Sequence, residues 1–102
     1  APSIAIISAL LKQGAQVRAY DPVAMPSAKK AFGTTIQYGK DYYSILKGAD
    51  ALMLLTEWNE FRRPNFERIL QLMKTPVIFD GRNIYPPRKL KDMGFEYYGI
   101  GC

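Results

Sequence analysis

The chain has 102 residues, 48% of them hydrophobic, which is about the size of one domain with one core. It contains one cysteine and no histidine, which excludes a disulfide framework, a histidine-bearing zinc site and a Ser-His or Cys-His catalytic pair. The net charge of +5 favours an anionic partner, either a nucleic acid or a phosphorylated small molecule.

The apolar runs are too short for a membrane. Ile4 to Leu11 and Ala51 to Leu55 fall far below the roughly 20 residues that a spanning helix needs, so we expect a soluble domain. Cys102 is interpreted as incidental rather than nucleophilic, and an unpaired thiol suits a reducing cytoplasm. The chain begins at Ala1, within an expected helix, and reads as a piece of a longer protein.

In the first half of the chain, turn residues separate helix-like from strand-like segments. The expected elements are a helix at 2–11, a strand at 16–20, a helix at 27–32, a strand at 36–38 and a helix at 42–47. Apolar residues cover most of the first helix, which predicts that it is buried, and Gly14 ends it. Asp21 is expected to fix its Asp-Pro turn, and Asp41 to cap the helix at 42–47.

The second half continues the alternation with a strand at 51–55, a helix at 65–73, a strand at 76–79, a helix at 86–93 and a last strand at 95–100. Ala51 to Leu55 is apolar throughout, which predicts a strand covered on both faces. Asn65 can cap its helix, whose apolar stripe is Phe66, Ile69, Leu70 and Met73. Five strands that alternate with helices predict an α/β fold with a mostly parallel sheet and right-handed crossovers.

The stretch from Thr75 to Asn83 is the main candidate site. A buried strand runs into Asp80-Gly81-Arg82-Asn83, and Gly81 is expected to take backbone angles closed to other residues. Turns that follow parallel strands share one rim of the sheet, so Asp21-Pro22, Thr56-Glu57-Trp58 and Asp80-Gly81-Arg82 are expected there together. No Gly-x-Gly-x-x-Gly turn and no Gly-Lys-Ser loop occurs, so the usual means of holding a dinucleotide or NTP is missing.

The sequence resembles the C-terminal domain of the UDP-glucose/GDP-mannose dehydrogenases, most closely the members that oxidise UDP-glucose. The likeness covers nearly the whole chain in order. The matching pieces are Ala1-Pro2-Ser3, Gly14-Ala15, Val17 to Pro22, Gly48 to Ala51, Thr56-Glu57-Trp58 with Phe61, Phe79 to Asn83, Gly94-Phe95, Tyr97-Tyr98 and Ile100-Gly101.

The resemblance implies a Rossmann-like three-layer sandwich, in which residues 1–102 form the C-terminal UDP-sugar-binding domain. It implies an oxidoreductase of polysaccharide biosynthesis that converts UDP-glucose to UDP-glucuronate with two NAD+. In such enzymes the NAD-binding domain and the catalytic cysteine lie N-terminal to this region, followed by a central helical part, and we expect a homo-oligomer. The first strand of the family's domain and a lysine-bearing loop also precede Ala1, so the sheet lacks a central strand.

The resemblance also places the substrate's diphosphate at Arg82, with Asp80, Gly81, Asn83, Glu57 and Trp58 as accompanying residues. It places no catalytic, cofactor-binding or metal-binding residue in this chain. Each candidate has a structural alternative: Arg82 pairs with Asp80 or a helix C-terminus, Trp58 packs over the rim, Glu57 forms a rim salt bridge or caps a helix, and Asn83 makes a local backbone hydrogen bond.

Other functions stay open. The domain could belong to a related dehydrogenase acting on GDP-mannose or a UDP-N-acetylhexosamine. A regulatory α/β module of response-regulator type would need acids clustered at strand ends, and Asp21, Glu57 and Asp80 stand in unsuitable turns. A nucleic-acid-binding module would need a basic stripe with exposed aromatics, whereas the lysines and arginines here are interspersed with acids.

Overall fold

In the computed structural model, residues 2–56 and 59–99 are described; Ala1, Glu57, Trp58 and residues 100–102 are not. The chain separates into two compact units, Ala1–Ile45 and Leu46–Cys102. The sequence predicted a single core. Among the described residues, all the buried hydrophobic side chains except those of Ile36 and Tyr42 lie in the second unit, which therefore holds the main core.

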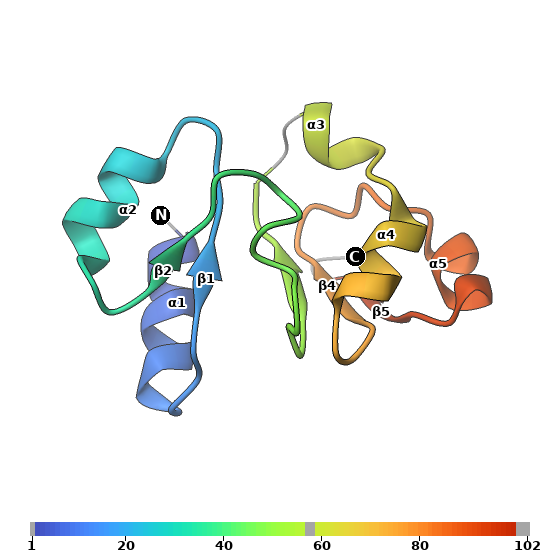
Figure 1. The fold of residues 1–102 in the computed structure, drawn as a ribbon, viewed down its shortest axis with the longest axis horizontal. Helices are drawn as coiled ribbons and strands as arrows, with labels where there is room; N and C mark the ends of the chain where they lie inside the picture. The colour runs from blue at the N-terminus through green and yellow to red at the C-terminus, as the bar shows by residue number, and fades with distance from the viewer. Residues whose placement is uncertain (1, 57–58, 100–102) are drawn as a thin grey trace. The chain divides into compact units, whose positions relative to one another are not determined.

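The first unit contains two helices and two short strands. In chain order they are α1 (Pro2–Lys12), β1 (Arg18–Ala19), α2 (Met25–Phe32) and β2 (Gln37–Tyr38). The strands pair in parallel, with Arg18 opposite Gln37, so α2 is the helix of a short β-α-β crossover (Figure 1). Gly14 (φ 86°) and Gly33 (φ 55°) end the two helices at the predicted positions, because both adopt positive φ.

Two predictions for the first unit are wrong. Helix α1 was expected to be buried, yet its described side chains are half-buried or exposed, and Ile4 is 44% exposed. Apolar residues around a helix show that it could be buried, but the helix is buried only if other elements pack against those residues. Residues 42–48 form turns instead of a helix, although Asp41 makes the bond of a helix cap: its Oδ1 accepts the Ser44 N–H (2.8 Å), while Ser44 Oγ donates to the Asp41 carbonyl (2.9 Å).

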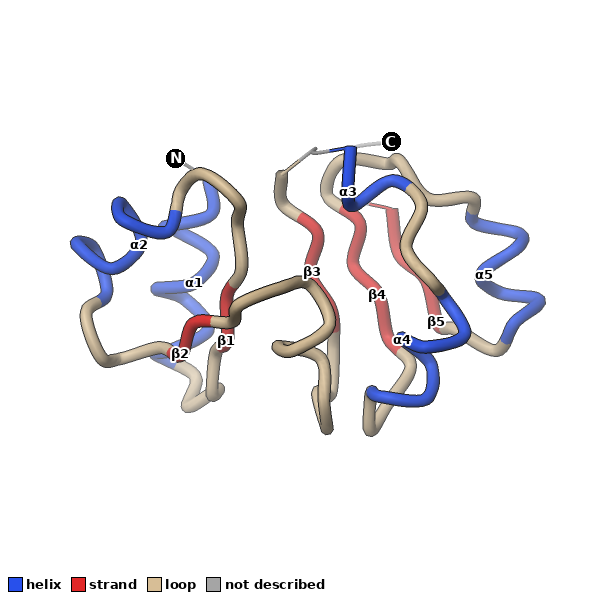
Figure 2. The backbone as a smooth tube through the Cα atoms, turned by 45° about the horizontal axis from the view of Figure 1, so that its top comes forward, coloured by secondary structure: helices blue, strands red, loops and turns tan. Residues whose placement is uncertain are grey.

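The second unit contains a three-stranded parallel sheet and three helices. They are β3 (Leu52–Leu54), α3 (Asn59–Arg62), α4 (Phe66–Leu72), β4 (Val77–Asp80), α5 (Pro87–Met93) and β5 (Glu96–Gly99). The strand order is β3-β4-β5, and Figure 2 shows the three strands side by side. The α/β class and the parallel pairing were predicted correctly, while helix α3 was not foreseen. The strands form two ladders, of two and three strands.

Helices α4 and α5 cover one face of this sheet. Right-handed crossovers from β3 to β4 and from β4 to β5 proceed in one direction, which places both connecting helices on the same side. That face carries the buried residues Leu52, Leu54, Ile78, Asp80 and Tyr97. Met53, on the opposite face, is only half-buried, so the prediction that β3 is covered on both faces is wrong.

Local signals set the helix ends in the second unit. Asn65 caps α4 as predicted, because its Oδ1 accepts the Arg68 N–H at 3.0 Å. Pro87 opens α5, and Gly94 (φ 105°) ends it in the left-handed conformation. Phe66 from α4 packs edge-on against Tyr85 and Phe95, with ring centroids 5.0 and 6.3 Å away, so the core closes around the segment that follows β4.

Candidate functional site

The candidate site is the 80–85 turn, residues 80 to 85, where β4 leads toward α5. The sequence placed Asp80 beyond the end of the strand, but Asp80 is the last residue of β4 and is fully buried. Its Oδ1 accepts the backbone N–H of Arg82 at 3.0 Å and that of Asn83 at 2.8 Å. Asp80 therefore points inward and shapes the turn, so its carboxylate is not a ligand-facing group.

Two tyrosines complete the hydrogen bonding of this carboxylate, and sequence reasoning assigned them only to core or edge packing. Asp80 Oδ2 accepts the backbone N–H of Tyr85 at 2.9 Å and the hydroxyl of Tyr97 at 2.8 Å. Both tyrosines are buried. Tyr97 faces inward on β5, next to β4, and this position could have identified it as a partner of Asp80. The position can be inferred only if the register between the two strands is known.

Gly81 is needed for space and not for unusual backbone angles. It is not among the glycines with positive φ, so the predicted reason is wrong. A Cβ atom at Gly81 would lie 3.0 Å from the carbonyl oxygen of Leu54, which accepts the Gly81 N–H at 2.8 Å. This bond joins the carboxyl ends of β3 and β4, as expected for two turns that share a rim.

Asn83 supplies the left-handed residue of the turn, with φ 56°. Asparagine tolerates this region better than most residues, and the hydrogen bond from its N–H to Asp80 helps to hold it there. The predicted local hydrogen bond of Asn83 is thus present, made by its backbone N–H.

Arg82 is exposed at the carboxyl end of β4. Its backbone N–H donates to Asp80 at 3.0 Å. The N–H groups of residues 82, 83 and 85 already donate to Asp80, and Pro86 and Pro87 at the start of α5 have no N–H to offer. Those backbone N–H groups are therefore not available to an anion, and Arg82 is the cation within the turn.

Asp21 belongs to the first unit and fixes its own turn as predicted, because its Oδ1 accepts the N–H groups of Val23 and Ala24 at 2.8 and 2.9 Å. Glu57 and Trp58 lie outside the described residues.

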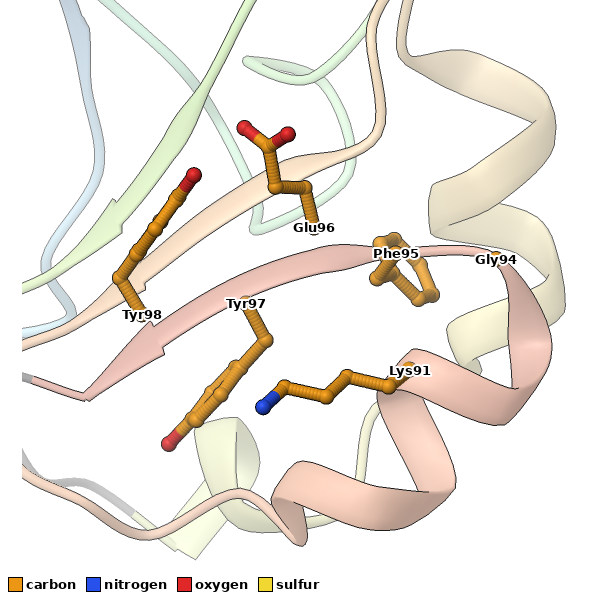
Figure 3. A pocket seen from close by; sticks show the side chains of 6 residues that line it. All are labelled: Lys91, Gly94, Phe95, Glu96, Tyr97 and Tyr98. Atoms are coloured by element: carbon orange, nitrogen blue, oxygen red, sulfur yellow. The ribbon is translucent and has the colours of Figure 1, made fainter.

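Two surface hollows lie near the last strand. One of about 370 Å³ borders the 80–85 turn and is lined by Asn83, Tyr85, Pro87, Lys91, Tyr97 and Gly99. The other, of about 500 Å³, lies over β5 and is lined by Lys91, Gly94, Phe95, Glu96, Tyr97 and Tyr98 (Figure 3). The larger hollow contains the carboxylate of Glu96 and no residue of the turn, so we do not assign an anionic ligand to it.

Neighbouring residues of β5 differ in environment because they point to opposite faces. Figure 3 shows Tyr97 and Lys91 on one side of the strand and Tyr98 and Glu96 on the other. A hydrogen bond with the Glu96 carboxylate raises the pKa of Tyr98 above its usual value of 10.0, with smaller contributions from burial and from the charge of Glu96. Tyr98 therefore stays protonated at neutral pH and stacks on Phe79 with ring centroids 5.2 Å apart.

The turns after β1 and β4 do not fit a dinucleotide. Binding of a pyrophosphate at a strand-to-helix turn needs free backbone N–H groups and close approach through glycines. In the turn after β1 the Asp21 carboxylate takes two of these N–H groups, and in the turn after β4 Asp80 takes three. Internal carboxylates thus occupy the places where a phosphate would bind.

Comparison with known proteins agrees with the resemblance seen in the sequence. Residues 1–87 match the UDP binding domain of the UDP-glucose/GDP-mannose dehydrogenase family. The chain is 42% identical over 106 residues to a UDP-glucose 6-dehydrogenase of Pseudomonas aeruginosa, covering 99% of this chain and 23% of that protein. It is 43% identical over 100 residues to the Rhizobium meliloti enzyme, with 98% and 23% covered.

A Bacillus subtilis relative, UDP-glucose 6-dehydrogenase TuaD, is 38% identical over 101 residues, covering 99% of this chain and 22% of that protein. The chain thus spans under a quarter of the length of these relatives. Among solved structures, a UDP-D-ManNAc dehydrogenase from Pyrococcus horikoshii superposes with a TM-score of 0.57 at 23% identity, covering 94% of this chain and 29% of that one, which supports the fold. The chain belongs to the UDP-glucose/GDP-mannose dehydrogenase family and corresponds to its UDP binding domain.

Proposed function

We propose that residues 1–102 form the C-terminal, substrate-nucleotide-binding domain of an NAD-dependent UDP-glucose 6-dehydrogenase, which oxidises UDP-glucose to UDP-glucuronate. Similarity to three relatives of that name at 38–43% identity supports this substrate over GDP-mannose or a UDP-N-acetylhexosamine. Within the domain we propose Arg82 as the contact to the diphosphate, with Asn83 beside it and Gly81 allowing the turn to approach β3.

The observation that carries this proposal is the way the 80–85 turn presents Arg82. The backbone N–H groups of residues 82, 83 and 85 donate to Asp80, so an incoming diphosphate meets a guanidinium held on a fixed backbone. A guanidinium is planar, permanently charged and able to donate two parallel hydrogen bonds to phosphate oxygens. The exposed position of Arg82 leaves it accessible to a ligand at the rim where open α/β sheets bind theirs.

The remaining parts of the reaction belong outside this chain. Since its described turns do not fit a dinucleotide, we propose that NAD and the reacting groups are held by the N-terminal domain of the same polypeptide. We likewise propose that the whole enzyme is a cytoplasmic homo-oligomer. Among the residues that the structure describes, no helix is long and apolar enough to cross a membrane.

The test is a set of variants of the full-length enzyme that carries this domain, assayed by NADH formation with varied UDP-glucose. Arg82→Ala should raise KM for UDP-glucose at least tenfold, since a charge-assisted hydrogen bond contributes about 1.5 to 3 kcal/mol. Arg82→Lys should recover only part of the loss, because an ammonium cannot present two parallel donors. The KM for NAD+ should stay unchanged in both variants.

Lys74→Ala is the matched control. It removes one exposed positive charge at the opposite, amino end of β4, so it reproduces the change in net charge without touching the rim. It should leave KM unchanged. If Arg82→Ala left KM unchanged while lowering the thermal midpoint, Arg82 would be a structural residue and the proposed site would be wrong.

A further inference from the structure

The Asp80 carboxylate uses its hydrogen-bonding capacity fully. An ionised carboxylate has about four acceptor positions on its two oxygens. Here each oxygen accepts two donors, the N–H groups of Arg82 and Asn83 on Oδ1, and the Tyr85 N–H and Tyr97 O–H on Oδ2. Asp80 is completely buried, so these four bonds replace the water that the charge has lost.

Tyr97 differs from the other three donors because it comes from a separate strand. Its backbone lies opposite Ile78 in the β4–β5 ladder, two residues before Asp80, and its ring reaches along the covered face to the end of β4. Its hydroxyl also lies 3.5 Å from the carbonyl oxygen of Tyr85. The hydroxyl therefore contacts both Asp80 and the far end of the 80–85 turn.

This arrangement links β5 to the conformation of Arg82. The three backbone donors move with the turn, so they cannot by themselves keep the carboxylate from turning with it. The Tyr97 hydroxyl is anchored in the sheet and holds Oδ2 in place, which leaves Oδ1 directed at the N–H groups of Arg82 and Asn83. Asn83 has φ 56°, and it can move to more favourable backbone angles at negative φ when its hydrogen bond to Asp80 weakens.

We propose that Tyr97 is a positioning residue for the nucleotide sugar: it holds the Asp80 carboxylate so that the 80–85 turn presents Arg82 in its binding geometry. The proposal rests on the proposed function of Arg82. Without the hydroxyl, the turn samples conformations in which the guanidinium is displaced, and the substrate binds only the fraction of molecules whose turn has the binding geometry. The apparent affinity for the nucleotide sugar is reduced by that fraction.

The experiment is Tyr97→Phe in the full-length enzyme, which removes one oxygen and keeps the ring. KM for UDP-glucose should rise about three- to tenfold, the effect of one lost hydrogen bond, with kcat changed less than twofold. The KM for NAD+ should be unchanged. Tyr98→Phe is the matched control, because it removes the same group from the adjacent residue of β5 on the opposite face, and its KM should equal that of the wild type.

Combination with Arg82→Ala separates positioning from general destabilisation. If Tyr97 acts through Arg82, adding Tyr97→Phe to Arg82→Ala should raise KM no further. Hydrogen exchange of the peptide that contains residues 80–85 should be faster in Tyr97→Phe than in Tyr98→Phe. Should Tyr97→Phe not fold, Asp80→Asn tests the same carboxylate, since an amide accepts through one of its two heavy atoms and two of the four donors then lose their acceptor, and it should raise KM in the same way.

The outcomes are distinct. An unchanged KM in Tyr97→Phe, or the same fold increase with and without Arg82, would overturn the role of Tyr97 while leaving Arg82 as the diphosphate contact. An unchanged KM in Arg82→Ala would instead overturn the proposed function on which this inference rests.

Discussion

Replacement of Asp80 by alanine should be among the most destabilising single substitutions in this domain. The substitution removes the acceptor of four hydrogen bonds and leaves their donors in place. Two of these bonds, from the Tyr85 N–H and the Tyr97 O–H, are buried. The other two, from the N–H groups of Arg82 and Asn83, are partly buried, and water can replace the carboxylate there more readily.

The expected magnitude follows from the buried donors. A buried donor without a partner costs about 1 to 3 kcal/mol, so two of them cost roughly 2 to 6 kcal/mol. Removal of the buried charge itself returns part of this cost, because a carboxylate is expensive to take out of water. A net loss of about 2 to 4 kcal/mol is expected, a large part of the 5 to 15 kcal/mol typical of a whole domain.

The assay is a denaturant or thermal midpoint for each variant, compared with two aspartate controls in the same protein, the half-buried Asp21 and the exposed Asp41. Asp21→Ala removes two hydrogen bonds from an N-terminal turn, and Asp41→Ala removes one. Each control should cost about 0.5 to 2 kcal/mol, the usual value for a capping residue. If Asp80→Ala destabilised the protein no more than Asp21→Ala, the buried carboxylate would not be holding the turn, and the inference about Tyr97 would fail with it.

Two further predictions concern the same domain. Gly81→Ala should lower the unfolding midpoint by an amount equivalent to about 1 to 3 kcal/mol, because its Cβ would lie 3.0 Å from the Leu54 carbonyl oxygen. Gly48→Ala is the control: its Cβ would meet no atom within 4 Å, so it measures the cost of backbone strain at positive φ alone. The 102-residue chain alone should form no NADH from UDP-glucose and NAD+, because its described turns lack a dinucleotide site; turnover by the purified chain would contradict this division of labour.

The locally encoded parts of the fold were predictable from sequence. Gly14, Gly33 and Gly94 end helices close to the expected residues, because glycine adopts positive φ with little strain. Asn65 caps α4 through a bond that spans three residues. In each case the residues that decide the geometry lie within one turn of one another, so a short window of sequence contains the whole cause.

The errors fall where a local signal is present but does not decide the structure. Residues 42–48 carry a capping aspartate and apolar positions, and Asp41 makes the capping bond to Ser44, yet the segment forms turns. Helix α1 has the apolar surface of a buried helix, and only the surrounding elements determine how much of it is covered. Composition and periodicity indicate how much apolar surface a segment has available to bury. They do not show how much of that surface is buried in the folded protein.

The candidate site shows the same division. By itself, the sequence determined that a strand, a glycine and an arginine succeed one another at a strand end, which was enough to select Arg82, and the likeness along nearly the whole chain suggested the family. Only the tertiary structure decided that Asp80 faces the core, that Gly81 is required by the Leu54 carbonyl, and that Tyr97 completes the carboxylate's coordination. These contacts join residues on neighbouring strands, and their register depends on the packing of the whole sheet.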